Sequence, residues 1–120
     1  MMKLIVYSCL SISLLFSFEK LTEENFEEKT LNKKVILDFF SKTCRTCKAL
    51  EENLIEYDKN TKQDVVIYKI DIEEEQGLAT EFSVRVIPTL IYFKDDEIIE
   101  RELGTRTPEQ IAKNVEEYLQ

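Results

Sequence analysis

Apolar and polar residues alternate along the chain with two different periods, and the changes of period predict an α/β domain. Residues 35–40 form a nearly continuous apolar run, which is typical of a buried strand. Across residues 44–59 the apolar positions recur at spacings of three and four, which indicates an amphipathic helix. Residues 65–72 and 89–93 have the strand pattern again.

Shorter patterns predict the elements that precede the first of these strands. Residues 17–21 are predicted to form a short strand. Thr22 is predicted to cap a helix whose first turn carries two glutamates, at the end where the helix dipole favours negative charge. Phe26 and Leu31 are the expected apolar contacts of that helix.

The second half of the chain continues the alternation and then closes with a hairpin. Residues 73–82 have a weaker helical pattern. Asp95 and Asp96 mark a turn, and the alternating residues 97–103 after it are predicted to pair with the preceding strand.

The clearest helix start in the chain is Thr107 followed by Pro108. Thr107 is the expected cap, Pro108 takes the first helical position, and Gln110 can complete a capping box. The predicted order is therefore β-α-β-α-β-α-β-β-α. This order indicates an α/β fold with a mixed central sheet and helices on both faces.

The first 17 residues differ in character from the rest of the chain. A basic start at Lys3 precedes the almost wholly apolar residues 4–16, which is the pattern of a secretory signal peptide or an N-terminal membrane anchor. Residues 18–120 would then be the domain, exported to an oxidising compartment such as a periplasm. The alternative is a cytoplasmic protein in which residues 4–16 are a strand or helix of the domain itself.

Charge and composition exclude several classes of function. The formal net charge is −8 with no basic stripe, so nucleic acid is not an expected partner. The chain has no histidine, which removes the commonest general base and the commonest metal ligand. Two glycines and two prolines in 120 residues argue against a disordered chain.

The candidate chemistry lies in Cys44 and Cys47, at the predicted start of the helix of residues 44–59. Structural zinc needs four ligands, and outside residues 1–17 the chain offers only these two thiols, so we expect no metal and no other cofactor. A thiolate at Cys44 would be stabilised by the unpaired N–H groups of the helix start and by Lys42, Arg45 and Lys48. The pair is predicted to be redox-active, with a purely structural disulfide as the alternative.

Several residues together resemble the thioredoxin family. Asp38 stands six residues before Cys44, Lys48 follows Cys47 directly, and Ile87-Pro88-Thr89 comes some forty residues later, before a strand. The resemblance covers about residues 18–119 and implies the thioredoxin fold. It also implies that Cys44 is the nucleophile, that Cys47 resolves the mixed disulfide, and that the pair is the redox centre of the protein.

The resemblance implies further roles around the cysteine pair. Asp38 is similar to the family's buried carboxylate that exchanges protons with the second cysteine, and burial would raise its pKa. Lys69 matches the lysine that pairs with this carboxylate, and Pro88 matches the cis-proline beside the disulfide. On the residues alone, Asp38 could instead bond to a neighbouring backbone, Lys69 could be solvated, and Pro88 could be trans.

The resemblance also suggests a substrate-binding surface, along which an extended segment could add as a strand. Its expected residues are Thr43, Arg45, Thr46, Ile87, Pro88 and Gly104. Thr43 stands where thioredoxins usually carry Trp, and Arg45-Thr46 stand where thioredoxin has Gly-Pro. Arg45 would favour the thiolate and so make the disulfide more oxidising.

The predicted function is that of a thiol–disulfide oxidoreductase that reduces or exchanges disulfides in exported proteins. Protein thiols and disulfides are the expected partners, with a membrane disulfide-transfer protein as the electron donor, and we expect a monomer. One alternative is an oxidant or isomerase of the same fold. Another is a non-catalytic binding module built on the same scaffold.

Overall fold

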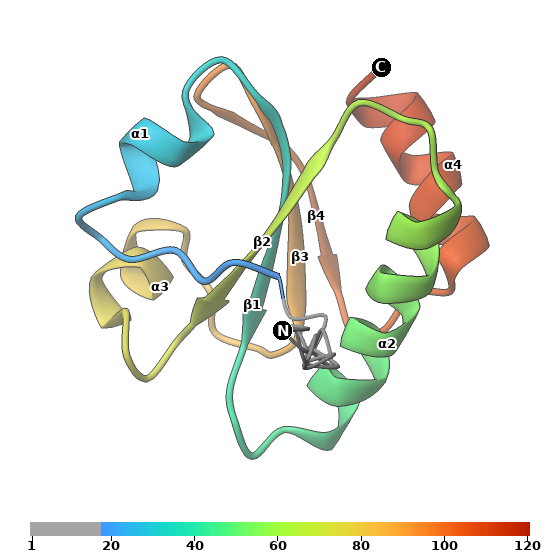
Figure 1. The fold of residues 1–120 in the computed structure, drawn as a ribbon. Coiled ribbons are helices and arrows are strands. Elements are labelled where there is room, and N and C mark those ends of the chain that lie inside the picture. The colour runs from blue at the N-terminus through green and yellow to red at the C-terminus, as the bar shows by residue number, and fades with distance from the viewer. Residues whose placement is uncertain (1–17) are drawn as a thin grey trace, which may run out of the picture.

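The apolar run near residue 35 forms the central strand of a mixed sheet in the computed structural model, which describes residues 18–120 (Figure 1). Two helices cover each face of this sheet. The elements in chain order are α1 (Phe26–Thr30), β1 (Lys34–Phe40), α2 (Arg45–Asn60), β2 (Val66–Asp71), α3 (Gln76–Glu81), β3 (Thr89–Lys94), β4 (Glu97–Leu103) and α4 (Pro108–Tyr118).

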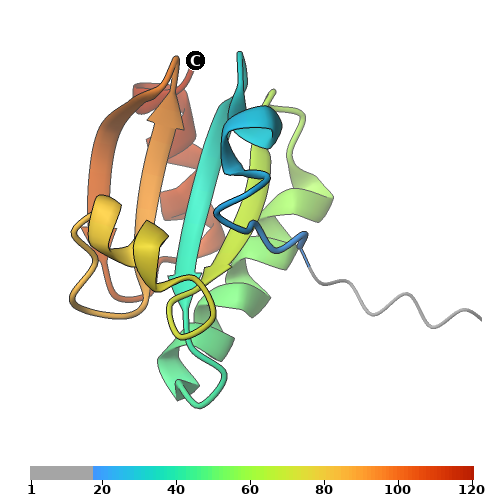
Figure 2. The same cartoon turned by 90° about the vertical axis from the view of Figure 1, so that its left-hand side faces the viewer.

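The strand order is β2-β1-β3-β4, as Figure 2 shows. Strand β2 runs parallel to β1, β3 runs antiparallel to β1, and β4 runs antiparallel to β3. The carboxyl ends of β1 and β2 therefore lie at the same edge of the sheet as the start of β3. The loop after β1 and the loop before β3 meet at this edge.

The face of the sheet under α1 and α3 is packed largely with aromatic side chains. The rings of Phe26 and Phe82 lie 5.3 Å apart between centroids, and Phe39 and Phe93 contact the same group. Such ring pairs each add about 1 kcal/mol beyond the apolar area that they bury. This packing attaches two very short helices to the sheet.

The opposite face is packed with aliphatic side chains from the two longer helices. Leu50 and Leu54 of α2 and Ile111 and Val115 of α4 are fully buried against residues such as Ile36 of β1. The spacing of four residues within each pair places both side chains on one face of their helix. The fold class predicted from the sequence, with helices on both faces of a mixed sheet, is confirmed.

The first strand, predicted over residues 17–21, is not formed in its described part, because among residues 18–21 only Lys20 forms a bridge, a single parallel one to Lys69. The Leu21 N–H donates to the Lys69 carbonyl at 2.8 Å, and the Lys69 N–H donates to the Glu19 carbonyl at 3.0 Å. The chain then turns away at Thr22, so the contact with β2 is too short to make a strand.

The first helix also begins later than predicted. Thr22 forms a turn in which its hydroxyl accepts from the Asn25 N–H at 3.2 Å, and Asn25 Oδ1 accepts from the Thr22 N–H at 2.8 Å. Helix α1 follows this turn, with Phe26 buried as expected. Leu31 lies beyond the helix and is 62% exposed, so its predicted packing is wrong.

The hairpin and the last helix have the local structure predicted for them. Asp95 and Asp96 both have positive φ, 51° and 65°, which is the conformation of a type I′ turn. Thr107 and Gln110 form the complete capping box at the start of α4.

The predicted leader, residues 1–17, lies outside the described residues. Among the helices of residues 18–120, none has the length and apolar character that a bilayer crossing requires.

Candidate active site

A disulfide bond joins Cys44 and Cys47 at the start of α2. Cys44 is the residue that caps the helix and is partly exposed, whereas Cys47 lies one turn further in and is 3% exposed. The two cysteines therefore differ in their exposure to solvent, as the predicted roles require. An incoming thiol or disulfide can reach Cys44, and Cys47 is shielded.

The backbone places the Cys44 sulfur over the first turn of α2. The Cys47 N–H donates to Cys44 Sγ at 3.1 Å, and the Thr46 hydroxyl lies 3.3 Å from the same sulfur. Because a disulfide sulfur carries no proton, the hydroxyl of Thr46 is the donor in the second contact. Donors at the positive end of a helix dipole stabilise negative charge on this sulfur.

The basic residues around Cys44 differ from the expectation in one respect. The Lys42 ammonium forms an ion pair with Glu74 at 2.8 Å, and Lys20 approaches the same carboxylate at 3.4 Å. The charge of Lys42 is thus largely compensated. Arg45 and Lys48 are exposed and have no ion-pair partner within residues 18–120, so they supply the positive field near Cys44.

The loop before β3 lies beside the disulfide-bearing loop, because Phe39 of β1 pairs with Thr89 of β3. The Ile87–Pro88 peptide bond is cis, as the resemblance implied. The Gly104 N–H donates to the Pro88 carbonyl at 2.9 Å, and Gly104 has a φ of +85°, a conformation that favours glycine. The predicted residues Pro88 and Gly104 are therefore in direct contact.

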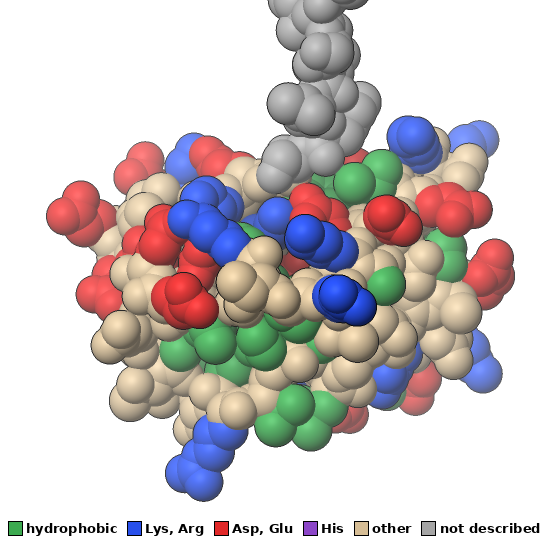
Figure 3. Space-filling view, turned by 90° about the horizontal axis from the view of Figure 1, so that it is seen from below, with side chains coloured by type: hydrophobic (Ala, Val, Ile, Leu, Met, Phe, Trp, Pro, Cys, Tyr) green, Lys and Arg blue, Asp and Glu red, His purple; other side chains and the backbone are tan. Residues whose placement is uncertain are grey.

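Two exposed apolar side chains flank this loop and were not among the predicted site residues. Val86 is 51% exposed, and Leu103, which pairs with Thr89 across the sheet, is 52% exposed. Figure 3, which views the molecule from this end, shows hydrophobic side chains gathered near the centre and charged ones around them. Their positions in the sequence, Val86 shortly before Pro88 and Leu103 directly before Gly104, are the signal that could have identified them.

Asp38 lies in the middle of the central strand on the face covered by α2. It is 0% exposed, and neither carboxylate oxygen has a hydrogen-bond partner within residues 18–120. Its neighbours on the two adjacent strands are Lys69 and Leu90. The alternative in which Asp38 bonds to a neighbouring backbone group is therefore wrong.

The expected ion pair between Asp38 and Lys69 is not formed in the described structure. Lys69 is buried, as the resemblance implied, but its ammonium donates to Glu51 Oε1 of α2 at 2.9 Å. The same ammonium lies 4.3 Å from the centroid of the Phe40 ring. Helix α2 supplies a second carboxylate, and that carboxylate holds the lysine instead of Asp38.

Burial is the main electrostatic influence on Asp38. Removal from water raises the pKa of Asp38 to about 7, with the Lys69 charge acting in the opposite direction and the Glu51 charge adding to the rise. A carboxyl with this pKa changes protonation near neutral pH. It can therefore both accept and return a proton under ordinary conditions.

Comparisons with known proteins agree with this geometry. The family model for thioredoxin matches residues 17–117. Thioredoxin from Buchnera aphidicola is 34% identical over 102 residues, covering 83% of this chain and 94% of the relative. Thioredoxin from Bacillus subtilis is 33% identical over 100 residues, covering 83% and 96%.

The chain belongs to the thioredoxin family. With a Cys-x-x-Cys disulfide at the start of α2, it is a thiol–disulfide oxidoreductase whose substrates are protein thiols and disulfides. Within residues 18–120, no three Cys, Asp or Glu side chains are grouped so that they could hold a metal ion.

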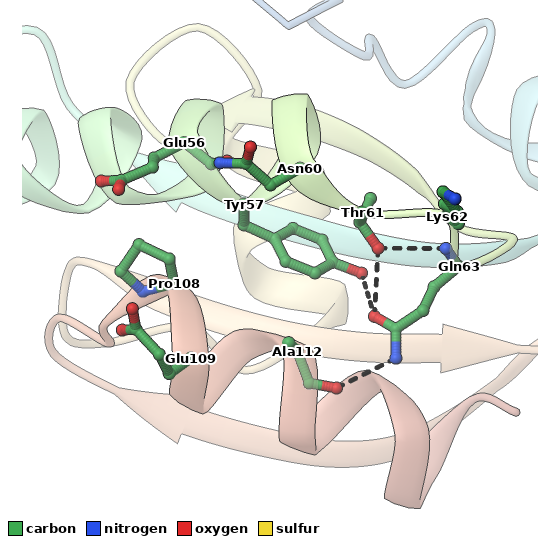
Figure 4. A pocket seen from close by; sticks show the side chains of 9 residues that line it. All are labelled: Glu56, Tyr57, Asn60, Thr61, Lys62, Gln63, Pro108, Glu109 and Ala112. Carbon is green, nitrogen blue, oxygen red and sulfur yellow. Dashed lines mark hydrogen bonds between the residues drawn. The ribbon is translucent and has the colours of Figure 1, made fainter.

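The pocket between α2 and α4 is separate from this thioredoxin-family site (Figure 4). Tyr57 is ten residues beyond Cys47, or roughly 15 Å along the helix. Its hydroxyl donates to Gln63 Oε1 at 2.6 Å, and Gln63 Nε2 donates to the Ala112 carbonyl at 3.1 Å. Through Gln63, these hydrogen bonds link α2 to α4 beside the pocket.

Sequence reasoning missed Glu51 as a member of the site. In the sequence, Glu51 is one of several polar residues between the apolar positions of the helix, and the hydrophobic pattern does not distinguish it from the others. Its position four residues after Cys47 places both side chains on one helical face, and this spacing is the one signal that could have identified it.

Proposed function

We propose that the protein exchanges disulfides with other proteins through Cys44 as the nucleophile and Cys47 as the resolving thiol. The observation that carries this proposal is the unequal burial of the two cysteines at the start of α2. The hydrogen bonds to Cys44 Sγ support its role as the thiolate.

In the reductive direction the reduced protein supplies two electrons. The Cys44 thiolate attacks one sulfur of a substrate disulfide, which forms a mixed disulfide and releases the other substrate sulfur as a thiolate. Cys47 then gives its proton to the Asp38 carboxylate and attacks Cys44 Sγ. The Cys44–Cys47 disulfide forms, the second substrate sulfur leaves as a thiolate that takes up a proton, and the substrate is reduced.

Asp38 is proposed as the proton acceptor because it lies buried beneath α2 with unpaired oxygens and a pKa near neutrality. Lys69 is proposed to act on the charge of Asp38 and not on the substrate, since it is buried and occupied by Glu51. No cofactor beyond the disulfide is proposed.

Single cysteine variants test the assignment of the two sulfurs. Cys44→Ser is expected to abolish reduction of a protein disulfide such as that of insulin. Cys47→Ser is expected to accumulate mixed disulfides with the substrate, visible on a non-reducing gel. Full activity of Cys44→Ser together with no trapped species in Cys47→Ser would contradict the assignment.

The proposed substrate surface consists of the loop at Pro88 and the residues around Cys44. Extended segments can add to exposed backbone beside such a loop, and the apolar side chains of Val86 and Leu103 offer contacts on either side. Exposed Thr43, Arg45 and Thr46 are the chain neighbours of Cys44, and half-buried Ile87 directly precedes Pro88. Leu103→Asp is expected to raise KM for a protein disulfide, with a small dithiol unaffected.

The direction of the reaction depends on the reduction potential. The leading proposal is a reductant, because the chain belongs to the thioredoxin family. Its reduction potential would then lie near that of thioredoxin, at about −270 mV. Exposed Arg45 and the two donors on Cys44 Sγ favour the thiolate and hence an oxidant or isomerase, for which a potential toward about −120 mV is expected. Equilibration in glutathione or dithiothreitol buffers distinguishes the two.

We also propose that the protein is exported, with residues 1–17 as leader or anchor, and receives electrons from a membrane disulfide-transfer protein. The basic start and the apolar residues 4–16 support this proposal. Fusion of residues 1–17 to alkaline phosphatase in a bacterial host is expected to give periplasmic activity. An inactive fusion retained in the cytoplasm would contradict export. A monomeric mass in sedimentation is also expected.

A further inference from the structure

Lys69 is held in place by two contacts, and neither of them is to Asp38. Its ammonium donates to Glu51 Oε1 at 2.9 Å and lies 4.3 Å from the centre of the Phe40 ring. The Lys69 side chain is only 8% exposed, so water competes weakly for these contacts. A buried ammonium between a carboxylate and an aromatic face has little freedom to turn elsewhere.

Asp38 is the carboxylate that Lys69 would otherwise neutralise. The two residues are neighbours in the register of β1 and β2, yet within residues 18–120 neither Asp38 oxygen has a partner. The charged groups that act on Asp38 are Lys69 from β2 and Glu51 from α2, while its neighbour on β3 is the apolar Leu90. After reduction of the disulfide, the Cys47 thiol of α2 is the other titratable group.

We propose that Glu51 is a positioning residue of the active site, which anchors the Lys69 ammonium against Phe40 and thereby withholds a counter-ion from Asp38. The proposal rests on the proposed role of Asp38 as proton acceptor and adds the group that controls it. Glu51 lies four residues after Cys47 on the same face of α2, the helix that covers Asp38. Its side chain is 24% exposed, which keeps it in contact with water.

Loss of the Glu51 charge should favour the ionised form of Asp38 for two reasons. The direct repulsion between two carboxylates is removed, and the released ammonium becomes able to approach Asp38. Both changes favour the ionised form of Asp38. In Glu51→Gln we therefore expect Asp38 to titrate at a pH lower by about one unit or more.

The test follows the carboxyl carbon of Asp38 by NMR across pH in the oxidised full chain. Glu51→Gln keeps the size of the side chain, and Glu52→Gln, an exposed neighbour on the same helix, is the matched control. The proposal expects the midpoint of Asp38 to fall in Glu51→Gln and to stay in place in Glu52→Gln. An unshifted midpoint in Glu51→Gln would overturn it.

A second pair of variants asks whether Glu51 acts through Lys69. Lys69→Met keeps most of the side-chain volume, and in this background Glu51→Gln is expected to shift the Asp38 midpoint by less than half as much. An equal shift in both backgrounds would overturn the positioning role and leave only direct repulsion.

Exchange kinetics separate this inference from the proposed function. The pH profile of mixed-disulfide resolution is expected to move with the Asp38 midpoint in Glu51→Gln. If the NMR midpoint moves and the kinetic profile does not, the inference about Glu51 holds and the role of Asp38 in exchange is wrong.

Discussion

Two carboxylates on the same face of the sheet differ in how their hydrogen bonds are satisfied. Asp38 of β1 and Glu102 of β4 lie in one row across the strands, with Leu90 of β3 between them. Glu102 accepts from the Tyr92 hydroxyl at 2.8 Å, from Asn114 Nδ2 at 2.8 Å, and from Arg106 Nε at 2.9 Å. Asp38 accepts from no group within residues 18–120.

This difference indicates that Glu102 stabilises the fold, whereas Asp38 does not. Glu102 joins β3, β4 and α4 in a satisfied network, which stabilises the packing of those elements. Asp38 has no such hydrogen bonds, and its burial away from water makes ionisation unfavourable. A buried carboxyl that is left without partners weakens the fold at neutral pH, and the proton exchange with Cys47 proposed above would explain its presence.

The largest expected effect concerns Asp38 and the pH dependence of stability. The pKa of Asp38 is about 7 in the folded protein and about 4 when unfolded, so the unfolded state releases this proton first as pH rises. Stability attributable to Asp38 is therefore lost between pH 4 and pH 7. At pH 8, Asp38→Asn is expected to raise the free energy of unfolding by up to about 4 kcal/mol.

Urea unfolding of the oxidised protein at pH 4 and pH 8 measures this effect. The wild type and Asp38→Asn should be nearly equal in stability at pH 4 and differ at pH 8. A difference of the same size at both pH values would show that the substitution changes packing and not ionisation.

A smaller effect, a loss of stability, is expected when Glu102 is replaced. Glu102→Ala leaves the buried hydroxyl of Tyr92 and the Arg106 side chain without their shared acceptor, and should lower the free energy of unfolding by about 2 kcal/mol. Glu97→Ala, exposed on the same strand, is the control and should change little. Equal stability of the two variants would remove the structural role assigned to Glu102.

The smallest expected effect separates stability from activity. Thr107→Ala removes the side-chain cap of α4 and should lower the free energy of unfolding by about 1 kcal/mol. Because Pro108 and Glu109 at this end of α4 lie beside Glu56 and Tyr57 of α2 and not beside Cys44, the rate of insulin reduction at 25 °C should be unchanged. A parallel loss of activity would mean that general destabilisation, and not proton exchange, explains changes seen in other variants.

The features that sequence alone could predict are those determined by local patterns. The run that forms β1, the capping box of Thr107 and Gln110, and the two aspartates of the hairpin turn were all predicted correctly. The cysteine pair was placed at a helix start because the apolar spacing changes there. In each case the residues that determine the structure lie within a few positions of one another.

The features that could not be predicted depend on contacts between distant segments. Glu51 and Lys69 are 18 residues apart, and only the packing of α2 on β2 brings their charges together. The strand predicted over residues 17–21 is not formed in its described part, because its pairing with β2 depends on where the chain turns at Thr22. The local pattern shows the periodicity of a segment, but it does not show how many of its residues pair with a neighbouring strand.

The most direct test of the account is the pH dependence of the step in which Cys47 resolves a mixed disulfide on Cys44. Reduced protein in which Cys9 is replaced by Ser, so that only two thiols remain, is mixed with Ellman's reagent in a stopped-flow instrument, where attack by Cys44 and resolution by Cys47 each release one coloured thiolate. Wild type, Asp38→Asn and Glu102→Gln are compared. The account predicts an inflection near pH 7 in the wild type and in Glu102→Gln that is absent from Asp38→Asn. The same profile in all three proteins would contradict it.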